Sequence, residues 1–195
     1  MVRTFIVRAR TAKTTPDFSV DDLPGSGRMD LVCRCISSAL FISLDVRRDT
    51  IIHVVLEGPK EPPKTITFYG DKIKDLQPDE RFLALIIKKA VSAKLEGKEV
   101  EVILGVFVSK KSFEAVVKEL AKTQLIYLDP DGKDIRKFEF KKDFTAVLSD
   151  YIGMPRKSEG WLERMNAEKI SLGPVTLFAS HAIVVMHNEI DRKLN

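Results

Sequence analysis

Arginine and aspartate side chains that could carry out proton-transfer chemistry occur close together early in the chain. Arg28 and Asp30 are two residues apart, directly after a Gly-Ser-Gly segment. A carboxylate can act as a general base, and a guanidinium can stabilise negative charge on a neighbouring oxygen. Arg34 lies one helical turn beyond Asp30 and could orient its carboxylate. Arg28 and Asp30 are therefore candidate catalytic residues, although helix capping and charge compensation between neighbours would produce the same pattern.

Basic residues are concentrated at the start of the chain. The 195 residues carry 32 Lys+Arg against 28 Asp+Glu, a net charge of +4. Residues 1–48 hold eight basic and five acidic side chains, so +3 of the excess lies there, and all but one of the basic residues are arginine. The planar guanidinium suits phosphate, so a nucleic-acid partner and a merely solvated face are equally compatible with this charge pattern. The candidate RNA-binding residues are Arg3, Arg8, Arg10, Arg28, Arg34, Arg47 and Arg48.

Several common classes of functional site are not supported. Cys33 and Cys35 are predicted to lie on different faces of one helix as buried thiols, and His53, His181 and His187 do not have the spacing of metal ligands. No metal site is therefore expected. The chain has no GxGxxG after a strand, no GxxxxGK[ST] and no GxSxG. These absences argue against a dinucleotide-dependent oxidoreductase, a P-loop enzyme and an α/β-hydrolase.

The elements that would position these residues alternate between strands and helices. Apolar periodicity predicts strands at 3–9, 50–57, 65–69, 99–108, 124–129, 144–149 and 169–173. Helices are predicted at 29–42, 79–95, 112–122, 158–166 and 176–192. This alternation predicts a single α/β domain over residues 1–195, with a mostly parallel sheet flanked by helices.

Loops after the predicted strands are the expected ligand sites, because ligands bind beyond the carboxyl ends of parallel strands. Three such loops, at 129–132, 150–155 and 173–174, lie in the last third of the chain. Gly153 would permit close approach of backbone to a ligand, although these glycines could equally be ordinary turn residues. No apolar run approaches the roughly 18 residues of a membrane span, so a cytoplasmic protein is expected.

Two long motifs carry a resemblance to a known family. AVLSDYIGMP at 146–155 and KISLGPVTLFASHAIVVMHNEIDR at 169–192 resemble the SPOUT class of S-adenosylmethionine-dependent RNA methyltransferases. LPGSGRMDLVCRCISSALFIS at 23–43, with LEGP at 56–59, is similar to the archaeal members that methylate N1 of pseudouridine 54 in the TψC arm of tRNA. The resemblance implies a deep trefoil knot over approximately 124–195 and an archaeal source.

The same resemblance implies the cofactor, partners and site residues. S-adenosylmethionine would be held by Leu128, Gly153, Ser171, Leu172, Gly173, Leu177 and Ala182. Ala182 stands where several relatives have cysteine, which leaves a backbone contact there. Asp30 would accept the N1 proton and Arg28 would stabilise the base, with Asp150 as a second carboxylate candidate. A homodimer is implied through the last helix, whose apolar stripe could equally pack on its own sheet.

Two other functions are compatible with this pattern. The first is N1-pseudouridine methylation of rRNA, as in a related ribosome-biogenesis enzyme that shares the Arg-x-Asp element seen at Arg28-Met29-Asp30. The second is a non-catalytic RNA-binding protein that keeps the knotted fold. Binding of S-adenosylmethionine and the identity of the modified RNA would distinguish these functions.

Overall fold

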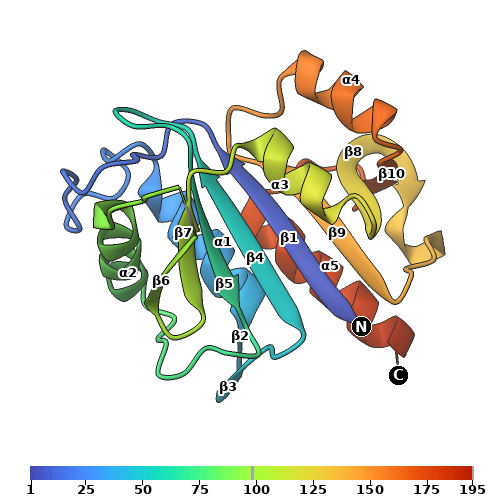
Figure 1. The fold of residues 1–195 in the computed structure, drawn as a ribbon. Coiled ribbons are helices and arrows are strands. Elements are labelled where there is room, and N and C mark those ends of the chain that lie inside the picture. The colour runs from blue at the N-terminus through green and yellow to red at the C-terminus, as the bar shows by residue number, and fades with distance from the viewer. Residues whose placement is uncertain (98, 195) are drawn as a thin grey trace.

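An eight-stranded sheet forms the centre of the computed structural model, which describes residues 1–97 and 99–194 (Figure 1). From one edge to the other its strands are β10 (Glu168–Ser171), β8 (Gln124–Asp134), β9 (Asp143–Ser149), β1 (Val2–Ala9), β4 (Thr50–Leu56), β5 (Lys64–Tyr69), β7 (Val106–Ser109) and β6 (Val100–Ile103). The strands from β10 to β4 are parallel, and those from β4 to β6 pair antiparallel. The predicted α/β fold is thus confirmed, with the parallel strands forming the larger part of the sheet.

Helices cover both faces of this sheet. Behind it in the view of Figure 1 lie α1 (Met29–Leu40), α2 (Glu80–Ser92) and α5 (Ala179–Leu194), and on the other face lie α3 (Phe113–Leu120) and α4 (Arg156–Arg164). The alternation of β1 shows why two layers form. Phe5 and Val7 point into the core under α1 and α5, while Ile6 points into the core under α3 and α4. No described helix combines the length and apolar composition required to cross a membrane.

Side-chain caps explain where two of the helices begin. The carboxylate of Asp79 accepts a hydrogen bond from the Phe82 N–H before α2, and the Ser112 hydroxyl accepts one from the Ala115 N–H before α3. The start of α1 is different. Arg28 precedes it with φ 61°, in the left-handed region, and its side chain does not cap the helix. A non-glycine residue in this conformation is uncommon and stores strain.

Two predicted strands differ from the structure. The strand expected at 99–108 is a hairpin of β6 and β7, because Gly105 adopts φ 79° and turns the chain. The turn expected at 130–132 lies within β8 instead. There β10 pairs with Tyr127 and then with Lys133, so the intervening residues bulge out of the ladder.

Element ends also differ in smaller ways. The last helix begins at Ala179 rather than Thr176, which leaves 176–178 in a loop. The small hairpin of β2 (Phe41–Ile42) and β3 (Asp45–Val46) and the 3-10 turn η1 (Ile135–Lys137) were not expected. These segments are too short to have a periodicity that would predict them.

A buried polar network joins β1 to α5 at the amino end of the parallel strands. Arg3 contacts Asp49 at 2.8 Å and Asp191 at 2.6 Å, and Arg47 contacts Asp191 at 2.7 Å. An Nη1 hydrogen of Arg3 is donated to Nδ1 of His187 at 3.2 Å, so Nε2–H of that ring donates to the Ala39 carbonyl at 3.0 Å. Burial, followed by the charges of Arg47 and Arg3, lowers the pKa of His187 to about 3. The imidazole is therefore neutral at physiological pH.

Candidate functional site

Two adjoining cavities open at the carboxyl ends of the parallel strands. The first, the α1 cavity, has a volume of about 290 Å³ and lies between β1, β9 and the first turns of α1 and α5. The second, the loop cavity, measures about 200 Å³ and lies among the segments that follow β8, β9 and β10. The residues that line both cavities are Ser149, Asp150, Gly153, Thr176, Leu177 and Ala179. A ligand in one cavity would therefore lie next to a ligand in the other.

The loop cavity brings together most of the residues that the sequence predicts for the cofactor. Its lining includes Leu128, Gly153, Leu172, Gly173, Leu177 and Ala182. Ser171 does not line it, but the Gly173 N–H donates to the Ser171 hydroxyl at 3.2 Å. Gly153 and Gly173 have φ values of 80° and 128°, and an added Cβ at either would meet no atom within 4 Å. Backbone at these two positions is thus open to a ligand.

Asp150 braces the loop between the two cavities. Its carboxylate accepts hydrogen bonds from the Arg10 N–H at 2.6 Å and from the Ile152 N–H at 3.1 Å. The Gly153 N–H closes the turn on the Asp150 carbonyl at 3.0 Å. Backbone donors already engage both of its carboxylate oxygens. The geometry therefore favours a loop-stabilising role for Asp150 over a role as proton acceptor.

Ser149 provides an unused polar group on the shared lining. Its hydroxyl oxygen is buried and makes no hydrogen bond with any described residue. A buried hydroxyl without a partner costs free energy, about 1–3 kcal/mol, unless a ligand or water completes it. Ser149 is therefore suited to donate to, or accept from, a polar group of a bound molecule.

Arg28 reaches the α1 cavity, while Asp30 lies behind it. The Nε and Nη2 atoms of Arg28 lie 3.0 Å from Oδ1 and Oδ2 of Asp30, and Arg34 also donates to Oδ2. Burial acts to raise the pKa of Asp30, but hydrogen bonding and charge from Arg28, with the charge of Arg34, outweigh it and lower that pKa below its ordinary value. Two arginines thus hold the carboxylate ionised.

This geometry speaks against the expectation that Asp30 takes a proton from a substrate. Its side chain is only 5% exposed, it lines neither cavity, and guanidinium groups engage both of its oxygens. A lowered pKa also weakens a carboxylate as a base. The arrangement favours a positioning role, in which Asp30 fixes the strained Arg28 so that its guanidinium faces the cavity.

The predicted phosphate-binding arginines are not gathered on one surface. Arg8 is 12% exposed, because its guanidinium pairs with Glu57 at 2.9 Å, donates to Ser158 at 2.6 Å and lies 4.6 Å from the centre of the Phe113 ring. Arg3 and Arg47 belong to the network at the amino end of the strands. Carboxylates already pair with these three guanidinium groups, which speaks against the expectation that they bind phosphate.

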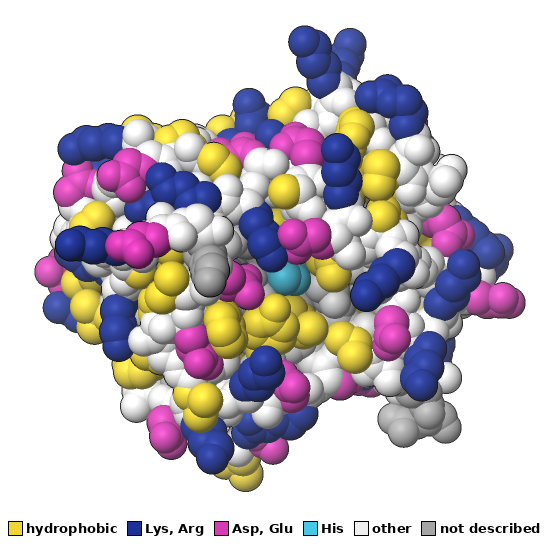
Figure 2. Space-filling model, viewed as in Figure 1, with side chains coloured by type: hydrophobic (Ala, Val, Ile, Leu, Met, Phe, Trp, Pro, Cys, Tyr) yellow, Lys and Arg dark blue, Asp and Glu magenta, His cyan; other side chains and the backbone are white. Residues whose placement is uncertain are grey.

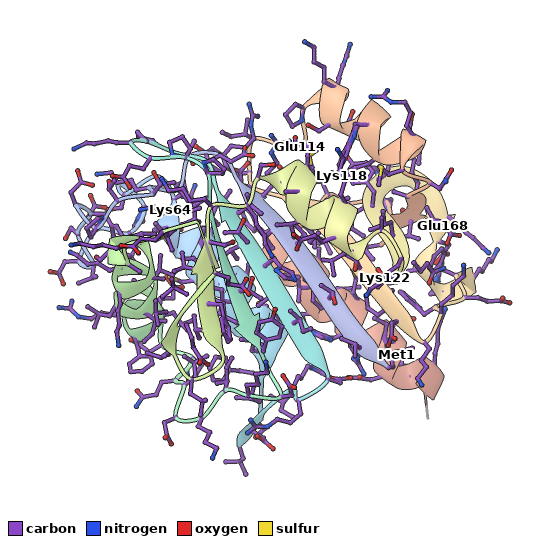
Figure 3. All side chains as sticks on the ribbon, viewed as in Figure 1. Met1, Lys64, Glu114, Lys118, Lys122 and Glu168 are labelled. Carbon is purple, nitrogen blue, oxygen red and sulfur yellow. The ribbon has the colours of Figure 1, made fainter. Side chains whose placement is uncertain are left out.

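Arg48 is exposed, but it lies at the opposite end of the sheet from the cavities. It donates to the carbonyls of Gly70 and Ile73 and pairs with Asp45. Figure 3 marks the two ends by Met1, near Arg3, and by Glu114, which lies 3.9 Å from Arg8. Of the arginines proposed from sequence, Arg10, Arg28 and Arg34 lie at the cavity end and are partly exposed, although Asp30 pairs with both Arg28 and Arg34, and Glu80 lies 3.5 Å from Arg34.

Other basic residues near the cavities were missed. Arg156 and Lys157 begin α4, two and three residues after Met154 of the loop cavity, and both are exposed. Among described residues neither forms an ion pair, and basic side chains project from α4 at the top of Figure 2. The pair follows the AVLSDYIGMP motif directly, so its position beside the predicted loop could have identified it.

An exposed apolar surface also surrounds the cavities. It comprises Tyr151, Ile152, Val175, Leu177, Phe178 and Val184, which are between 36% and 70% exposed. The predicted stripe of the last helix is divided by the structure. Ile183, Met186 and Ile190 are buried in the core, whereas Phe178 and Val184 face outward. A surface of this kind on a folded chain commonly marks an interaction site.

The cysteine thiols near the site are poor nucleophiles, and the described residues form no metal-binding group. Cys35 lines the α1 cavity, but burial raises the pKa of its thiol to about 12. Cys33 is also free and buried, and burial raises its pKa too. Within residues 1–97 and 99–194 no group of His, Cys, Asp and Glu side chains could hold a metal ion.

Comparison with known proteins gives a consistent result. A family model described as SAM-dependent RNA methyltransferase matches residues 2–194. Proteins named tRNA (pseudouridine(54)-N(1))-methyltransferase are similar along nearly their whole length. That of Methanococcoides burtonii is 42% identical, covering 100% of this chain and 98% of its own, and that of Thermococcus kodakarensis is 44% identical, covering 97% and 99%.

A solved structure supports the fold. The crystal structure of Archaeoglobus fulgidus Nep1 bound to S-adenosylhomocysteine aligns with a TM-score of 0.64 and 12% identity, covering 98% of each chain. At this identity the likeness concerns the arrangement of helices and strands alone.

Proposed function

The chain belongs to the family of SAM-dependent RNA methyltransferases, and on this premise we propose that it methylates N1 of the pseudouridine at position 54 of tRNA. Relatives that carry this activity in their names are more than 40% identical over nearly the full chain. The observation that carries the proposal is the pair of adjoining cavities with a common lining. Such a pair can hold a methyl donor and an acceptor base next to each other.

The loop cavity is the proposed site of S-adenosylmethionine. When bound, the cofactor supplies a methyl group activated by a sulfonium. The residues present fit such a molecule, because Leu128, Leu172 and Leu177 offer apolar surface for the adenine ring. Gly153 leaves backbone open to a ligand, and the unpartnered Ser149 hydroxyl offers one hydrogen bond.

The α1 cavity is the proposed site of the target base, and Arg28 is the cationic group on its lining. N1 of pseudouridine resembles an imide nitrogen and is a poor nucleophile until its proton leaves, and that proton passes to solvent water because donors already engage the carboxylates of Asp30 and Asp150. Negative charge then develops on the adjacent carbonyl, where a guanidinium can stabilise it. Asp30 and Arg34 hold that guanidinium in place before substrate arrives. Alignment of the base with the methyl group by the cavity walls supplies a further part of the rate enhancement.

The substrate-binding surface is proposed to include Arg10, Arg34, Arg156 and Lys157, which lie at the cavity end of the sheet and expose basic side chains. Contacts from these residues to phosphate would give a salt-dependent affinity for tRNA. The target base is normally stacked in its loop, so binding must also expose it.

We further propose the knot, the dimer and the single domain of residues 1–195. The packing of β10 against the β8 bulge is compatible with the knot, since a Cβ on Gly132 would lie 2.6 Å from backbone atoms of Ile170. Exposed Val175, Phe178 and Val184 beside the cavities support packing against a second copy. A cytoplasmic location follows from the proposed tRNA substrate.

Incubation of the purified protein with S-adenosylmethionine and tRNA tests the function. Nucleoside mass spectrometry should find N1-methylpseudouridine in tRNA that contains pseudouridine 54 and none in the same tRNA with uridine there. An rRNA fragment containing pseudouridine is the parallel substrate, and its exclusive modification would support the rRNA alternative. Binding of tRNA without binding of the cofactor in calorimetry would support a non-catalytic RNA-binding protein.

A further inference from the structure

Tyr151 is the largest exposed side chain at the tip of the loop between the two cavities. Its ring lines the α1 cavity and is 53% exposed. Nothing in the core requires an aromatic residue here, because the ring is packed into neither apolar cluster. Aromatic side chains normally bury much of their surface, so an exposed aromatic ring on a cavity wall is a candidate binding surface.

Hydrogen bonds of Asp150 fix the loop that carries Tyr151. Asp150 accepts the N–H groups of Arg10 and Ile152, and the Gly153 N–H returns to the Asp150 carbonyl at 3.0 Å. This tight turn presents two consecutive exposed side chains, Tyr151 and Ile152. Only the first of these lines a cavity. The fold therefore places the ring at the α1 cavity without placing its neighbour there.

The ring is also paired with a fixed cation. The guanidinium carbon of Arg28 lies 5.2 Å from the centre of the Tyr151 ring, within the range of a cation–π interaction. Asp30 holds that guanidinium through two hydrogen bonds of 3.0 Å. Tyr151 and Arg28 thus form a preorganised pair of planar groups on one wall of a cavity of about 290 Å³.

Planar aromatic and guanidinium groups are the surfaces on which unstacked RNA bases are held. A target base taken out of its loop loses its stacking neighbours and requires a replacement. Two exposed aromatic rings line this cavity, Tyr151 and Phe178, among aliphatic residues such as Leu31. Of the two, Tyr151 is the ring that a guanidinium fixed by Asp30 faces, and its turn is held by Asp150, so Tyr151 is the better-placed stacking surface for a base.

We infer that Tyr151 is a substrate-binding residue whose ring stacks on the target pyrimidine of the RNA. In this arrangement Arg28 fixes the position of the ring relative to the base. This inference rests on the proposed function, since it requires an RNA base in the α1 cavity. It assigns affinity for an unpaired base to the loop at 150–153, and it leaves the cofactor contacts in the loop cavity unchanged.

The test compares Tyr151→Ala with Ile152→Ala, a matched control on the same turn that is 47% exposed and lines neither cavity. Tyr151→Ala should weaken binding of a pseudouridine-containing TψC stem-loop by about tenfold or more, the usual effect of removing one stacking ring. Tyr151→Phe should bind as the wild type does, and Ile152→Ala should change affinity less than about threefold. Tyr151→Leu replaces the alanine variant if the latter does not fold.

Two further measurements separate stacking from other roles. Affinity for S-adenosylmethionine, measured by calorimetry, should be the same in wild type and Tyr151→Ala, because the ring is assigned to the base. The loss in RNA affinity should also be equal at low and high salt, since stacking releases no counterions, whereas the loss in Arg156→Ala should shrink as salt rises.

Equal RNA binding by Tyr151→Ala and Ile152→Ala would overturn the inference, as would a loss confined to cofactor affinity. Either result leaves the proposed function intact, provided that wild-type protein methylates the tRNA. A wild type that binds neither cofactor nor tRNA would instead remove the proposed function itself.

Discussion

The two ends of the parallel strands are built from similar residues but differ in how these residues are satisfied. At the amino end, Arg3, Arg47 and His187 contact carboxylates, a carbonyl or one another in a closed network. At the carboxyl end, Arg28 has a left-handed backbone and the Ser149 hydroxyl lacks a partner. The first arrangement stabilises the fold, whereas the second leaves groups available to a ligand.

The burial of an arginine decides whether it stabilises the fold or can contact a ligand. Arg3 and Arg28 each contact carboxylates, but Arg3 is buried between strands and the last helix, while Arg28 is a third exposed at a cavity. Strain is retained at functional sites when the neighbouring structure enforces it. Variants at the two ends should therefore separate stability from activity, and the expected effects below run from the largest to the smallest.

Replacing Arg3 should give the largest effect, and the effect should fall on stability. Arg3→Ala removes a buried guanidinium that contacts Asp49, Asp191 and His187, so the free energy of unfolding should fall by about 3 kcal/mol, the lower end for a broken buried ion pair. Urea denaturation followed by circular dichroism measures it. Arg48→Ala, at the same end but exposed, is the control and should change stability by less than about 0.5 kcal/mol.

A stability loss in Arg3→Ala no greater than that of Arg48→Ala would show that the network does not hold the last helix. The cofactor affinity of folded Arg3→Ala should equal that of wild type, because Arg3 lines neither cavity.

Replacing Arg28 should act mainly on activity. Arg28→Ala removes the charged group of the α1 cavity and should lower kcat for methyl transfer about 100-fold, close to 2.7 kcal/mol, as is typical for loss of one charge-stabilising donor. Single-turnover assays with saturating tRNA measure it. Arg28→Lys keeps the charge but loses the two-point contact with Asp30, and should recover only part of the rate.

Arg28→Ala with wild-type kcat would place the charge stabilisation elsewhere. A fall in unfolding free energy as large as that of Arg3→Ala would instead assign Arg28 to the fold.

Acid should destabilise the amino end through His187. Its pKa is lowered from 6.5 to about 3 in the folded chain, so the unfolded chain binds a proton first as pH falls. The stabilising contribution is complete above pH 6.5 and is lost progressively between pH 6.5 and about 3. Between pH 6.5 and about 5 it should lower the free energy of unfolding by about 1.5 kcal/mol.

His187→Gln should remove that part of the pH dependence when unfolding is measured at both pH values. His53, whose pKa burial lowers to about 4, contributes in the same direction and serves as the comparison through His53→Gln. A pH profile identical in wild type and His187→Gln would mean that the imidazole is not held neutral by the network.

The family resemblance named much of the loop cavity before its geometry was known. Leu128 lies in β8, and Leu172 and Gly173 follow β10, so the three residues come from two segments that are apart in the sequence. The rule that ligands bind beyond the carboxyl ends of parallel strands pointed to the same edge of the sheet. The hairpin at Gly105 was missed because a continuous apolar run does not show where the chain reverses.

Roles within the site were harder to predict than its position. Asp30 was expected to face a substrate, whereas two guanidinium groups cover its carboxylate. Tyr151 was missed because an aromatic residue in a loop is more often buried. Spacing along the chain showed that Arg28 and Arg34 could reach Asp30, but whether they leave a carboxylate oxygen exposed to a substrate depends on side-chain conformation and burial, which spacing does not contain.

The sequence by itself determined the alternating elements, the mostly parallel sheet and the loops that line the cavities, because apolar periodicity and turn residues act over a few neighbouring positions. Only the tertiary structure decided which arginines are available. Arg8 forms an ion pair with Glu57, and Arg47 forms one with Asp191, and both partners are distant in sequence. Arg28 instead lies at a cavity wall beside Tyr151. The physical reason is that the charge a side chain offers to a ligand depends on its burial and its partners, and both arise from packing between distant segments.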